Sequence, residues 1–323
     1  MQKVVVTGAG GFIGGHLVQQ LVAAGQTEIT AVDIKPPDEW FQRDARADNV
    51  SVDLQDLGAC RRIVSGAGTV YNLAADMGGM GFIENNKALC MLSVLINTHL
   101  LMAARETGVH RYFYSSSACV YNAAKQAVPG VAGLAEADAY PAMPEDGYGW
   151  EKLFSERMCR HFSEDFGLET RVARYHNVYG PHGAYDGGRE KAPAAICRKV
   201  IRAKLSGDHR IVVWGNGSQT RSFTYISDCL EGTRRLMESD VRDPINIGSS
   251  EMVTIDQLVD LVEGIAGVRL TREYDTDAPT GVAGRNSDNC RVKQLLDWEP
   301  STPLLAGLEA TYRWIYDQLR ASV

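Results

Sequence analysis

The chain has 323 residues, of which 45% are hydrophobic and 23% charged, and its net charge is -7. This length suits one large α/β domain or two domains around a cleft, and the composition is that of a soluble protein. The negative charge argues against a nucleic-acid partner. No apolar run reaches the ~20 residues of a membrane span, so no membrane partner is expected. The N-terminus enters a strand without a signal peptide, which favours a cytoplasmic location.

The first half of the chain alternates strand and helix patterns. Short β-rich runs predict strands at 3–7, 28–33, 69–74, 111–116 and 170–180. Helical spacing of apolar residues predicts helices over 10–25, 85–108 and about 148–165. Alternation of this kind indicates an α/β fold with a doubly wound parallel sheet of the Rossmann type.

After Gly180 the pattern loosens into a glycine-rich loop. Further helices are expected over 191–205, 254–267 and 304–320, and short strands over 211–214 and 222–226. We predict a nucleotide-binding domain over 1–180 and a smaller, substrate-binding α/β domain mainly over 181–323. Some later segments, about 222–250, are expected to return to the first domain.

The seven cysteines are scattered along the chain, and none forms a CxxC pair or a metal-ligand spacing with histidine. No metal site is therefore expected. Most of these thiols are interpreted as small buried hydrophobes.

A glycine motif, TGAGGFIGG at 7–15, follows a strand and opens a helix. Gly8, Gly11 and Gly14 permit a tight turn and a close approach of the backbone to a pyrophosphate, which the helix N-terminus then binds. Asp33 ends the second strand at the distance expected for an acid that binds ribose hydroxyls. The alternative is a structural turn, but the strand–turn–helix context favours a dinucleotide site.

The acid at the end of the second strand favours NAD over NADP, since a carboxylate repels a 2′-phosphate, although the nearby Lys35 weakens this preference slightly. Phe12 and Ile13, inside the glycine motif, are assigned to the same cofactor site. Asp53 is a candidate for contact with the adenine, and a solvated loop acid is the alternative.

The sequence GYGWEK (147–152) places Tyr148 and Lys152 four residues apart, on one face of a helix start. An ammonium near a phenol lowers the phenol pKa, so the phenolate would serve as a base near neutral pH. Together with Ser117 at a strand end and a bound nicotinamide, this pair suits removal of a hydride and a proton from a secondary alcohol.

On these motifs, the chain resembles the extended short-chain dehydrogenase/reductases over essentially its full length. This group of NAD-dependent epimerases and dehydratases includes enzymes that act on nucleotide sugars. The resemblance implies oxidation of a sugar at C4 by enzyme-bound NAD, with later reversal. It also implies a homodimer formed through the helices near 85–108 and 148–165.

The turn SSSACVYN (115–122) departs from the dehydratases of this group, whose segment resembles S-T-D-E-V-Y. Ala118 and Cys119 stand at the positions of the acid and base of water elimination. A thiolate is a soft base, and protons on C3 and C5 become acidic once C4 is a ketone. An ammonium on the other ring face would return a proton with inversion. Lys191 is the candidate, at a helix start that lowers the pKa of a cation, and a surface lysine is the alternative.

A second set of motifs extends the resemblance, and together they are similar to the GDP-mannose 3,5-epimerase family. The motifs are AADMGGMGF (74–82), SSAC (116–119), YGWEK (148–152), RYHNVYGP (174–181), GGREKAPAA (187–195), QTRSFTY (219–225), NIGSSE (246–251) and GRNSDN (284–289). The resemblance implies Cys119 and Lys191 as the epimerising base and acid, with Tyr148 and Lys152 performing the redox step at C4. The implied isomerase reaction converts GDP-mannose to GDP-L-galactose, with GDP-L-gulose as a C5-only product.

The same resemblance implies further contacts with the nucleotide sugar. Arg221 and Arg285 are the expected phosphate clamps, since a planar guanidinium suits diphosphate oxygens, and Asn177 is expected near the diphosphate. The residues expected to border the sugar are Met77, Gly78 and Gly79. The remaining substrate residues are Ser117, Ala118, Cys119, Glu190, Lys191, Ala192, Lys199, Gln219 and Thr220.

Asn122, where the family usually has proline, Trp150, and residues 123–140 depart from the pattern. A different nucleotide sugar and a 4-epimerase therefore stay open as alternatives, and Ala118 argues against a 4,6-dehydratase. A binding protein that senses NAD or a nucleotide without catalysis is an alternative of another class, which the intact catalytic set disfavours.

Overall fold

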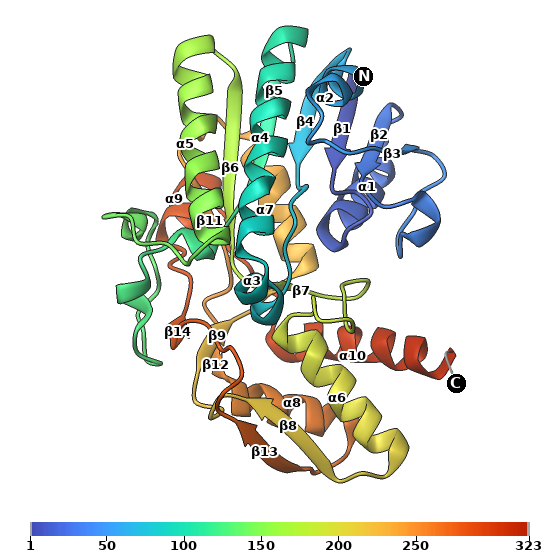
Figure 1. Cartoon of the computed structure of the whole chain (residues 1–323), viewed down its shortest axis with the longest axis vertical. Coiled ribbons are helices and arrows are strands. Elements are labelled where there is room, and N and C mark those ends of the chain that lie inside the picture. Colours follow the sequence, from blue (N-terminus) through green and yellow to red (C-terminus); the bar gives the residue numbers. More distant parts are fainter. Residues whose placement is uncertain (1, 322–323) are drawn as a thin grey trace.

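The computed structural model describes residues 2–321 and has two regions, shown one above the other in Figure 1. The upper region is built on a seven-stranded sheet in which every neighbouring pair is parallel. In sheet order, its strands are β11 (Ile245–Ile247), β6 (Glu169–Tyr175), β5 (Arg111–Ser117), β4 (Ala67–Asn72), β1 (Lys3–Thr7), β2 (Ile29–Asp33) and β3 (Asp48–Ser51). The predicted Rossmann-type fold class is confirmed.

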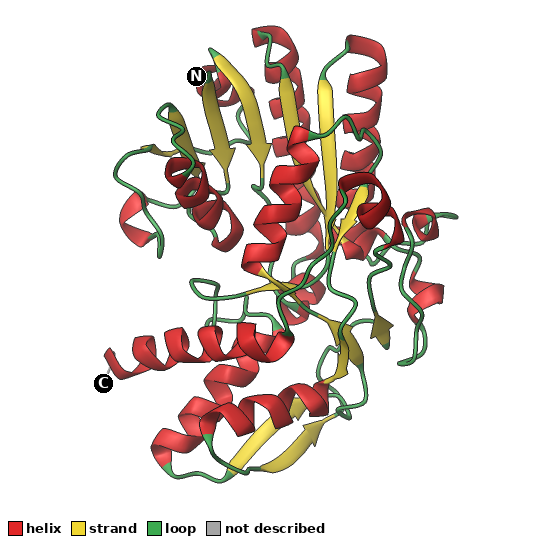
Figure 2. Cartoon of the chain, turned by 180° about the vertical axis from the view of Figure 1, so that it is seen from behind, coloured by secondary structure: helices red, strands yellow, loops and turns green. Residues whose placement is uncertain are grey.

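Helices cover both faces of this sheet, as Figure 2 shows from behind. On one side are α1 (Phe12–Ala23), α7 (Ile226–Glu238) and α9 (Cys290–Leu296), and on the other are α2 (Leu57–Val64), α4 (Lys87–Thr107) and α5 (Tyr148–Phe166). Successive strand residues face opposite sides, so Val4 and Val6 enter one apolar core while Val5 enters the other. Burial on both faces explains the nearly continuous apolar strand sequences.

The lower region has its own apolar core between helices and two small sheets. Its helices are α6 (Ala192–Ser206), α8 (Ile255–Ala266) and α10 (Leu304–Ala321). Its strands form the pair β13 (Thr271–Asp275) with β8 (Arg210–Trp214), and the sheet β12 (Met252–Thr254), β9 (Thr220–Ser222) and β14 (Gly284–Arg285). Because β11 pairs with β6, the chain returns to the upper sheet after β9. The domain boundary at residue 180 stays a prediction.

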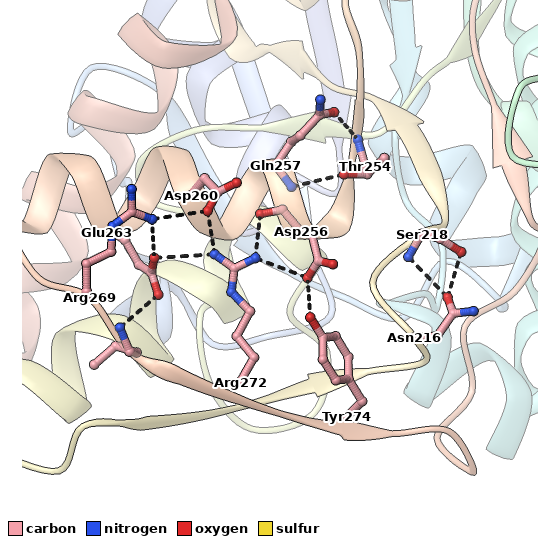
Figure 3. A network of polar contacts seen from close by, with 11 residues as sticks. Asn216, Ser218, Thr254, Asp256, Gln257, Asp260, Glu263, Arg269, Arg272 and Tyr274 are labelled. Atoms are coloured by element: carbon pink, nitrogen blue, oxygen red, sulfur yellow. Dashed lines mark hydrogen bonds and ion pairs between the residues drawn. The ribbon is translucent and has the colours of Figure 1, made fainter.

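A network of charges joins β13 to α8 (Figure 3). Arg272 on the strand lies 2.5 Å from the Asp260 carboxylate and 3.2 Å from that of Asp256, both on the helix. It also lies 3.3 Å from Glu263, whose carboxylate is buried. Residues of β13 are mostly exposed, so these ion pairs fix a strand that buries little apolar surface.

Several elements differ from the sequence-based expectation. The expected helix over 85–108 is confirmed as α4, but a further short helix, α3 (Met80–Asn85), precedes it and is separated from it at Asn86, whose φ of -135° is not helical. The expected strand over 222–226 is divided: β9 ends at Ser222, the two-residue strand β10 (Thr224–Tyr225) pairs with β7 (Val178–Tyr179), and α7 then begins at Ile226. Asp228 in the first turn of α7 favours a helix start there.

Several loops contain short 3₁₀ helices. They are the 3₁₀ turns η1 (Pro37–Glu39), η2 (Ala118–Val120), η3 (Ala123–Gln126) and η4 (Glu136–Ala139). The second of these carries the cysteine of the SSSACVYN turn directly after β5, at the carboxyl end of the parallel sheet. Ligands of open α/β sheets lie at that edge.

Candidate active site

The glycine motif forms the turn between β1 and α1. Gly8 adopts a φ of +69°, which favours glycine, and a Cβ added at Gly14 would overlap the carbonyl oxygen of Gly8. Asp33 ends β2, and its carboxylate accepts hydrogen bonds of 3.0 Å from the backbone N–H groups of Gly10 and Lys35. The turn therefore has the close backbone approach and the acid that a dinucleotide site requires.

The other residues predicted for the cofactor are placed as follows. Phe12 and Ile13 form the first turn of α1, directly after Gly11. Asp53 is exposed in the loop after β3, and its carboxylate accepts a hydrogen bond of 2.8 Å from the N–H of Gln55. The adenine contact of Asp53 stays a prediction.

Tyr148 is the first residue of α5, and Lys152 lies one turn later on the same side. Both side chains are buried, and the Lys152 ammonium lies 5.5 Å from the centre of the Tyr148 ring. Ser117, at the end of β5, lies close enough to the Tyr148 hydroxyl to lower the pKa of the phenol. The strand end and the helix start therefore bring the predicted Ser–Tyr–Lys set together.

The electrostatics of Tyr148 differ from the prediction. Burial raises the pKa of Tyr148 well above its usual value, and Cys119 and Glu151 raise it further, while the hydrogen bond from Ser117 lowers it. The predicted lowering of the Tyr148 pKa is therefore wrong for the protein alone: burial dominates, and the Lys152 ammonium lies 3.5 Å from the buried Glu151 carboxylate. The positive charge of Lys152 is thus partly neutralised by Glu151, the residue that precedes it in the motif.

Between the two regions lies a cavity of about 230 Å³. Most residues predicted for the sugar nucleotide line it. They are Met77, Gly78, Gly79, Ser117, Ala118, Cys119, Tyr148, Asn177, Glu190, Lys191, Ala192, Lys199, Gln219, Arg221 and Arg285. An open depression of about 660 Å³ borders this cavity at Pro279 and Thr280. Such a cleft between two layers is where small-molecule sites of this fold occur.

Thr220 is the predicted substrate residue that does not line the cavity, because its hydroxyl donates instead to the carbonyl oxygen of Pro129. Sequence reasoning missed several lining residues, namely Met80, Tyr175, Phe223, Pro279 and Thr280. Pro279 and Thr280 come from a loop without periodic pattern, so only the tertiary structure reveals them.

Cys119 is buried in the turn η2, where its N–H donates to Ser117 Oγ at 3.2 Å. Its sulfur lies 3.6 Å from Nη1 of Arg285, a buried arginine that also pairs with Glu145 and donates to Gln126 Oε1 at 2.8 Å. A guanidinium at this place supplies positive charge beside the sulfur. The role of Arg285 as a phosphate clamp stays a prediction.

Arg221, the second predicted clamp, lies beside Arg285, because the two residues are register partners on the neighbouring strands β9 and β14. Its guanidinium donates to the carbonyl oxygens of Thr220 at 2.7 Å and Thr280 at 3.0 Å. Burial lowers the pKa of Arg221 to about 10, and this is offset in part by the nearby Cys119. The side chain thus brings a largely unneutralised cation into the cavity.

Lys191 caps the N-terminus of α6 and faces the same cavity. Burial lowers the pKa of Lys191, and the Cys119 thiol is close enough to oppose this shift. The predicted direction is confirmed, but burial is its main cause rather than the helix end. An ammonium with a lowered pKa gives up its proton more readily.

The two weaker candidates of this segment have protein partners. The Glu190 carboxylate accepts from Arg198 at 2.7 Å, and the Lys199 ammonium donates to the carbonyl oxygen of Val212 at 2.8 Å and lies 5.6 Å from the Trp214 ring centre. Their contacts with a substrate stay predictions.

All seven cysteines are free, and six of them are buried, as expected for small apolar residues. Cys290 is the exposed one. Within residues 2–321, no three His, Cys, Asp or Glu side chains are grouped so as to hold a metal ion.

The sequence of this chain is similar to those of known proteins. The NAD dependent epimerase/dehydratase family matches residues 4–248. GDP-mannose 3,5-epimerase 1 of Oryza sativa subsp. japonica is 46% identical over 318 residues, which are 98% of this chain and 82% of that protein. GDP-mannose 3,5-epimerase of Arabidopsis thaliana is also 46% identical, over 319 residues, with 98% and 83% of the two chains covered.

Solved structures agree in fold. UDP-glucose 4-epimerase of Thermotoga maritima superimposes with a TM-score of 0.86 at 24% identity, over 98% of this chain and 99% of that one. MoeE5, solved with UDP-glucuronic acid and NAD, gives a TM-score of 0.79 at 28% identity, over 99% and 100% of the two chains. This chain is a member of the NAD dependent epimerase/dehydratase family, and its cofactor is NAD.

Proposed function

We propose that this protein is a GDP-mannose 3,5-epimerase, which converts GDP-mannose to GDP-L-galactose and yields GDP-L-gulose when only C5 is inverted. One observation carries the proposal: Cys119 and Lys191, from distant segments, line the same cavity as Tyr148. A redox step at C4 alone has no use for a second base and acid. The relatives that share 46% of its residues carry the same activity in their names.

The first step takes place at the Tyr148 hydroxyl. The glycine turn and Asp33 would hold NAD, which would supply a reversible hydride acceptor for C4. In the protein alone, burial keeps the Tyr148 phenol protonated; the positive charge of bound NAD would add to that of Lys152 and favour the phenolate, as Ser117 does. As a phenolate, Tyr148 removes the proton of the C4 hydroxyl and returns it when C4 is reduced. Once oxidised, the sugar carries a ketone at C4, which makes the protons on C3 and C5 acidic.

The second step uses the two sides of the cavity. Cys119 removes a proton from one face of the ring, and the adjacent Arg285 guanidinium, which shares its charge with Glu145, donates a hydrogen bond toward the sulfur that must act as a base. Lys191 delivers a proton to the other face, so the carbon is inverted. Exchange with solvent restores the thiolate and the ammonium, and the product carries solvent hydrogen at the inverted carbons.

Proton NMR of GDP-mannose with the protein in deuterium oxide, without added cofactor, tests this proposal. We expect deuterium at C3 and C5 together with new galactose- and gulose-configured signals. Inversion at C4 without exchange at C3 and C5 would instead identify a 4-epimerase. Exchange only with another nucleotide sugar would change the substrate and keep the chemistry. Absence of exchange with every nucleotide sugar tried would favour a sensor without catalysis.

We also propose a homodimer through α4 and α5. Among described residues, α4 is the one helix long and apolar enough to cross a membrane, with 39% of its apolar window buried. A second copy would cover the large apolar side chains exposed on the two helices, which are Leu89, Met91, Leu92, Leu95, Trp150 and Phe154. Sedimentation of Leu92→Glu should then show monomers, with the exposed Leu305→Glu as a dimeric control. A wild-type monomer, or a membrane-bound protein in cell fractions, would contradict the proposal.

A cytoplasmic location is proposed on the free thiols, because a reducing compartment keeps cysteines unpaired. Cell fractionation with antibody detection tests this, and recovery of the protein outside the cytoplasm would contradict it.

A further inference from the structure

The loop that precedes Lys191 is held to α6 by the Asp186 and Glu190 carboxylates, which pair with Arg198 at 3.1 Å and 2.7 Å, but these contacts stay within the lower region. Gly187 and Gly188 both adopt a φ of +86°, and nothing lies within 4 Å of a Cβ added at either. Backbone of this kind is conformationally free. To fix Lys191 relative to Cys119, which belongs to the upper region, the loop also needs a contact across the cleft.

Arg189, between the glycine pair and Lys191, makes such a contact. Its Nη1 lies 2.7 Å from the Asp76 carboxylate and donates to the carbonyl oxygen of Met77 at 3.0 Å. Its guanidinium carbon also lies 3.8 Å from the centre of the Phe82 ring. All three partners belong to residues 76–82, which follow β4 and lead into α3, at the junction of the two regions (Figure 1).

The backbones of the two segments also meet. The N–H of Gly79 donates to the carbonyl oxygen of Arg189 at 3.0 Å. A Cβ added at Gly78 would lie 3.1 Å from the Cα of Arg189, and one added at Gly79 would overlap the carbonyl oxygen of Glu190. Close packing of this kind explains why the segment beside the sugar cavity contains two glycines.

We propose that Arg189 is a positioning residue for the epimerisation step: together with Asp76, Met77 and Phe82 it forms a clasp across the cleft that holds Lys191 opposite Cys119. This inference rests on the proposed function. The Arg189 and Asp76 side chains are 46% and 33% exposed, and exposed ion pairs add little to global stability. The effect of the clasp therefore falls on the geometry of the loop.

Arginine suits this position better than lysine. One guanidinium nitrogen serves both a carboxylate and a carbonyl oxygen while the planar group lies against an aromatic ring, a stacking contact for which the compact lysine ammonium is less suited. The clasp does not touch the reacting atoms. It acts through Lys191, and a small displacement of an acid costs a large factor in rate.

The test compares Arg189→Met with Arg202→Met. Arg202 is a matched control because it pairs with Asp186 in the same loop and is similarly exposed, but does not reach residues 76–82. We expect kcat for proton exchange at C3 and C5 to fall roughly 10- to 100-fold in Arg189→Met, with little change in KM. The kcat of Asp76→Asn should fall by a similar factor. Arg189→Lys should retain part of the rate that Arg189→Met loses, and Arg202→Met should have the wild-type rate.

Full proton exchange in Arg189→Met would overturn the proposal, and so would an equal loss in Arg202→Met. The double variant Asp76→Asn/Arg189→Met should lose no more than the worse single variant, because the two groups form one contact. Additive losses would show that Arg189 acts elsewhere.

Hydrogen exchange of the backbone amides separates this inference from the proposed function. Peptides that cover residues 76–82 and 186–192 should exchange faster in Arg189→Met than in wild type and Arg202→Met, whatever the enzyme acts on. If wild type fails to epimerise GDP-mannose, the proposed function fails and faster exchange still supports the clasp. Unchanged exchange in both peptides would overturn it.

Discussion

The nucleotide end and the sugar end of this protein are built in different ways. The nucleotide end comes from one continuous segment, β1–α1–β2, and its shape depends on glycine backbone and one carboxylate. The sugar end collects side chains from at least six separate segments of both regions. Many of these side chains are buried and ionisable, and burial shifts the pKa values of Tyr148, Lys191 and Arg221.

This difference separates two kinds of dependence. A turn made of backbone is sensitive to an added methyl group and carries little charge that changes with pH. A site made of buried ionisable groups depends on protonation and on how the two regions meet. Variants at the nucleotide end should therefore lose stability and bound NAD, whereas variants at the sugar end should lose catalytic rate or become sensitive to pH.

Tyr148→Phe should have the largest effect. Removal of the hydroxyl leaves no base for the C4 proton, so we expect kcat to fall by roughly 10²- to 10⁴-fold. All later exchange should fall with it, while bound NAD is retained. Tyr140→Phe, at an exposed tyrosine, is the control. A 4-keto sugar that still forms at the wild-type rate would refute the role of Tyr148.

Cys119→Ser should stop epimerisation but leave the preceding oxidation at C4 intact. Because a serine hydroxyl is a far weaker base than a thiolate, exchange at C3 and C5 should fall by roughly 10²- to 10⁴-fold, while NADH still forms on the enzyme. Cys90→Ser is the matched control, since Cys90 belongs to the same apolar cluster but does not line the cavity. Unchanged turnover in Cys119→Ser would remove the thiol from the mechanism.

His176, at the carboxyl end of β6, should make the sugar end sensitive to acid. Burial lowers the pKa of His176 to about 4, and its Nε2 lies 3.0 Å from Asn246 Oδ1. Below the unfolded pKa of about 6.5, the unfolded chain binds a proton that the folded chain refuses. The free energy of unfolding should therefore fall by about 3 kcal/mol as the pH falls from about 6.5 to about 4.

Chemical denaturation at several pH values measures this slope. The slope should be smaller in His176→Gln and unchanged in His110→Gln, where the histidine is exposed. Equal slopes in all three proteins would show that other groups cause the acid sensitivity.

Of the four predicted effects, we expect the smallest for Gly14→Ala and Gly15→Ala. The two variants should differ from each other in stability and in NAD content. Alanine favours both helix positions by about 1 kcal/mol. At Gly14 the methyl group overlaps the fixed backbone of Gly8, so we expect a net loss of about 2 kcal/mol and loss of bound NAD. At Gly15 it meets Cβ of the buried Gln42 at 2.9 Å, away from the Gly8 turn, so we expect a smaller loss of stability and retention of bound NAD. Thermal unfolding and NAD released on denaturation measure both, and similar results for the two variants would contradict this explanation of the turn.

The sequence by itself determined the class of fold, the NAD turn and most members of the catalytic set. Strand and helix periodicity are local, and the residues Gly8–Gly14 and Asp33 or Tyr148 and Lys152 act at fixed local spacings, so the chain order carries their geometry. The identity of Cys119 and Lys191 came from motifs that resemble a known family, rather than from spacing.

Only the tertiary structure decided how the distant parts meet. It placed Arg285 against the Cys119 sulfur and Arg189 against Asp76, contacts between residues far apart in the sequence that no periodic pattern encodes. It also reversed the expected pKa of Tyr148, because burial and a neighbouring acid outweigh the lysine one turn away. Burial and long-range contacts depend on the packing of the whole chain. The chemistry of the cleft therefore depends on how the two regions are placed relative to one another, which the sequence pattern does not specify.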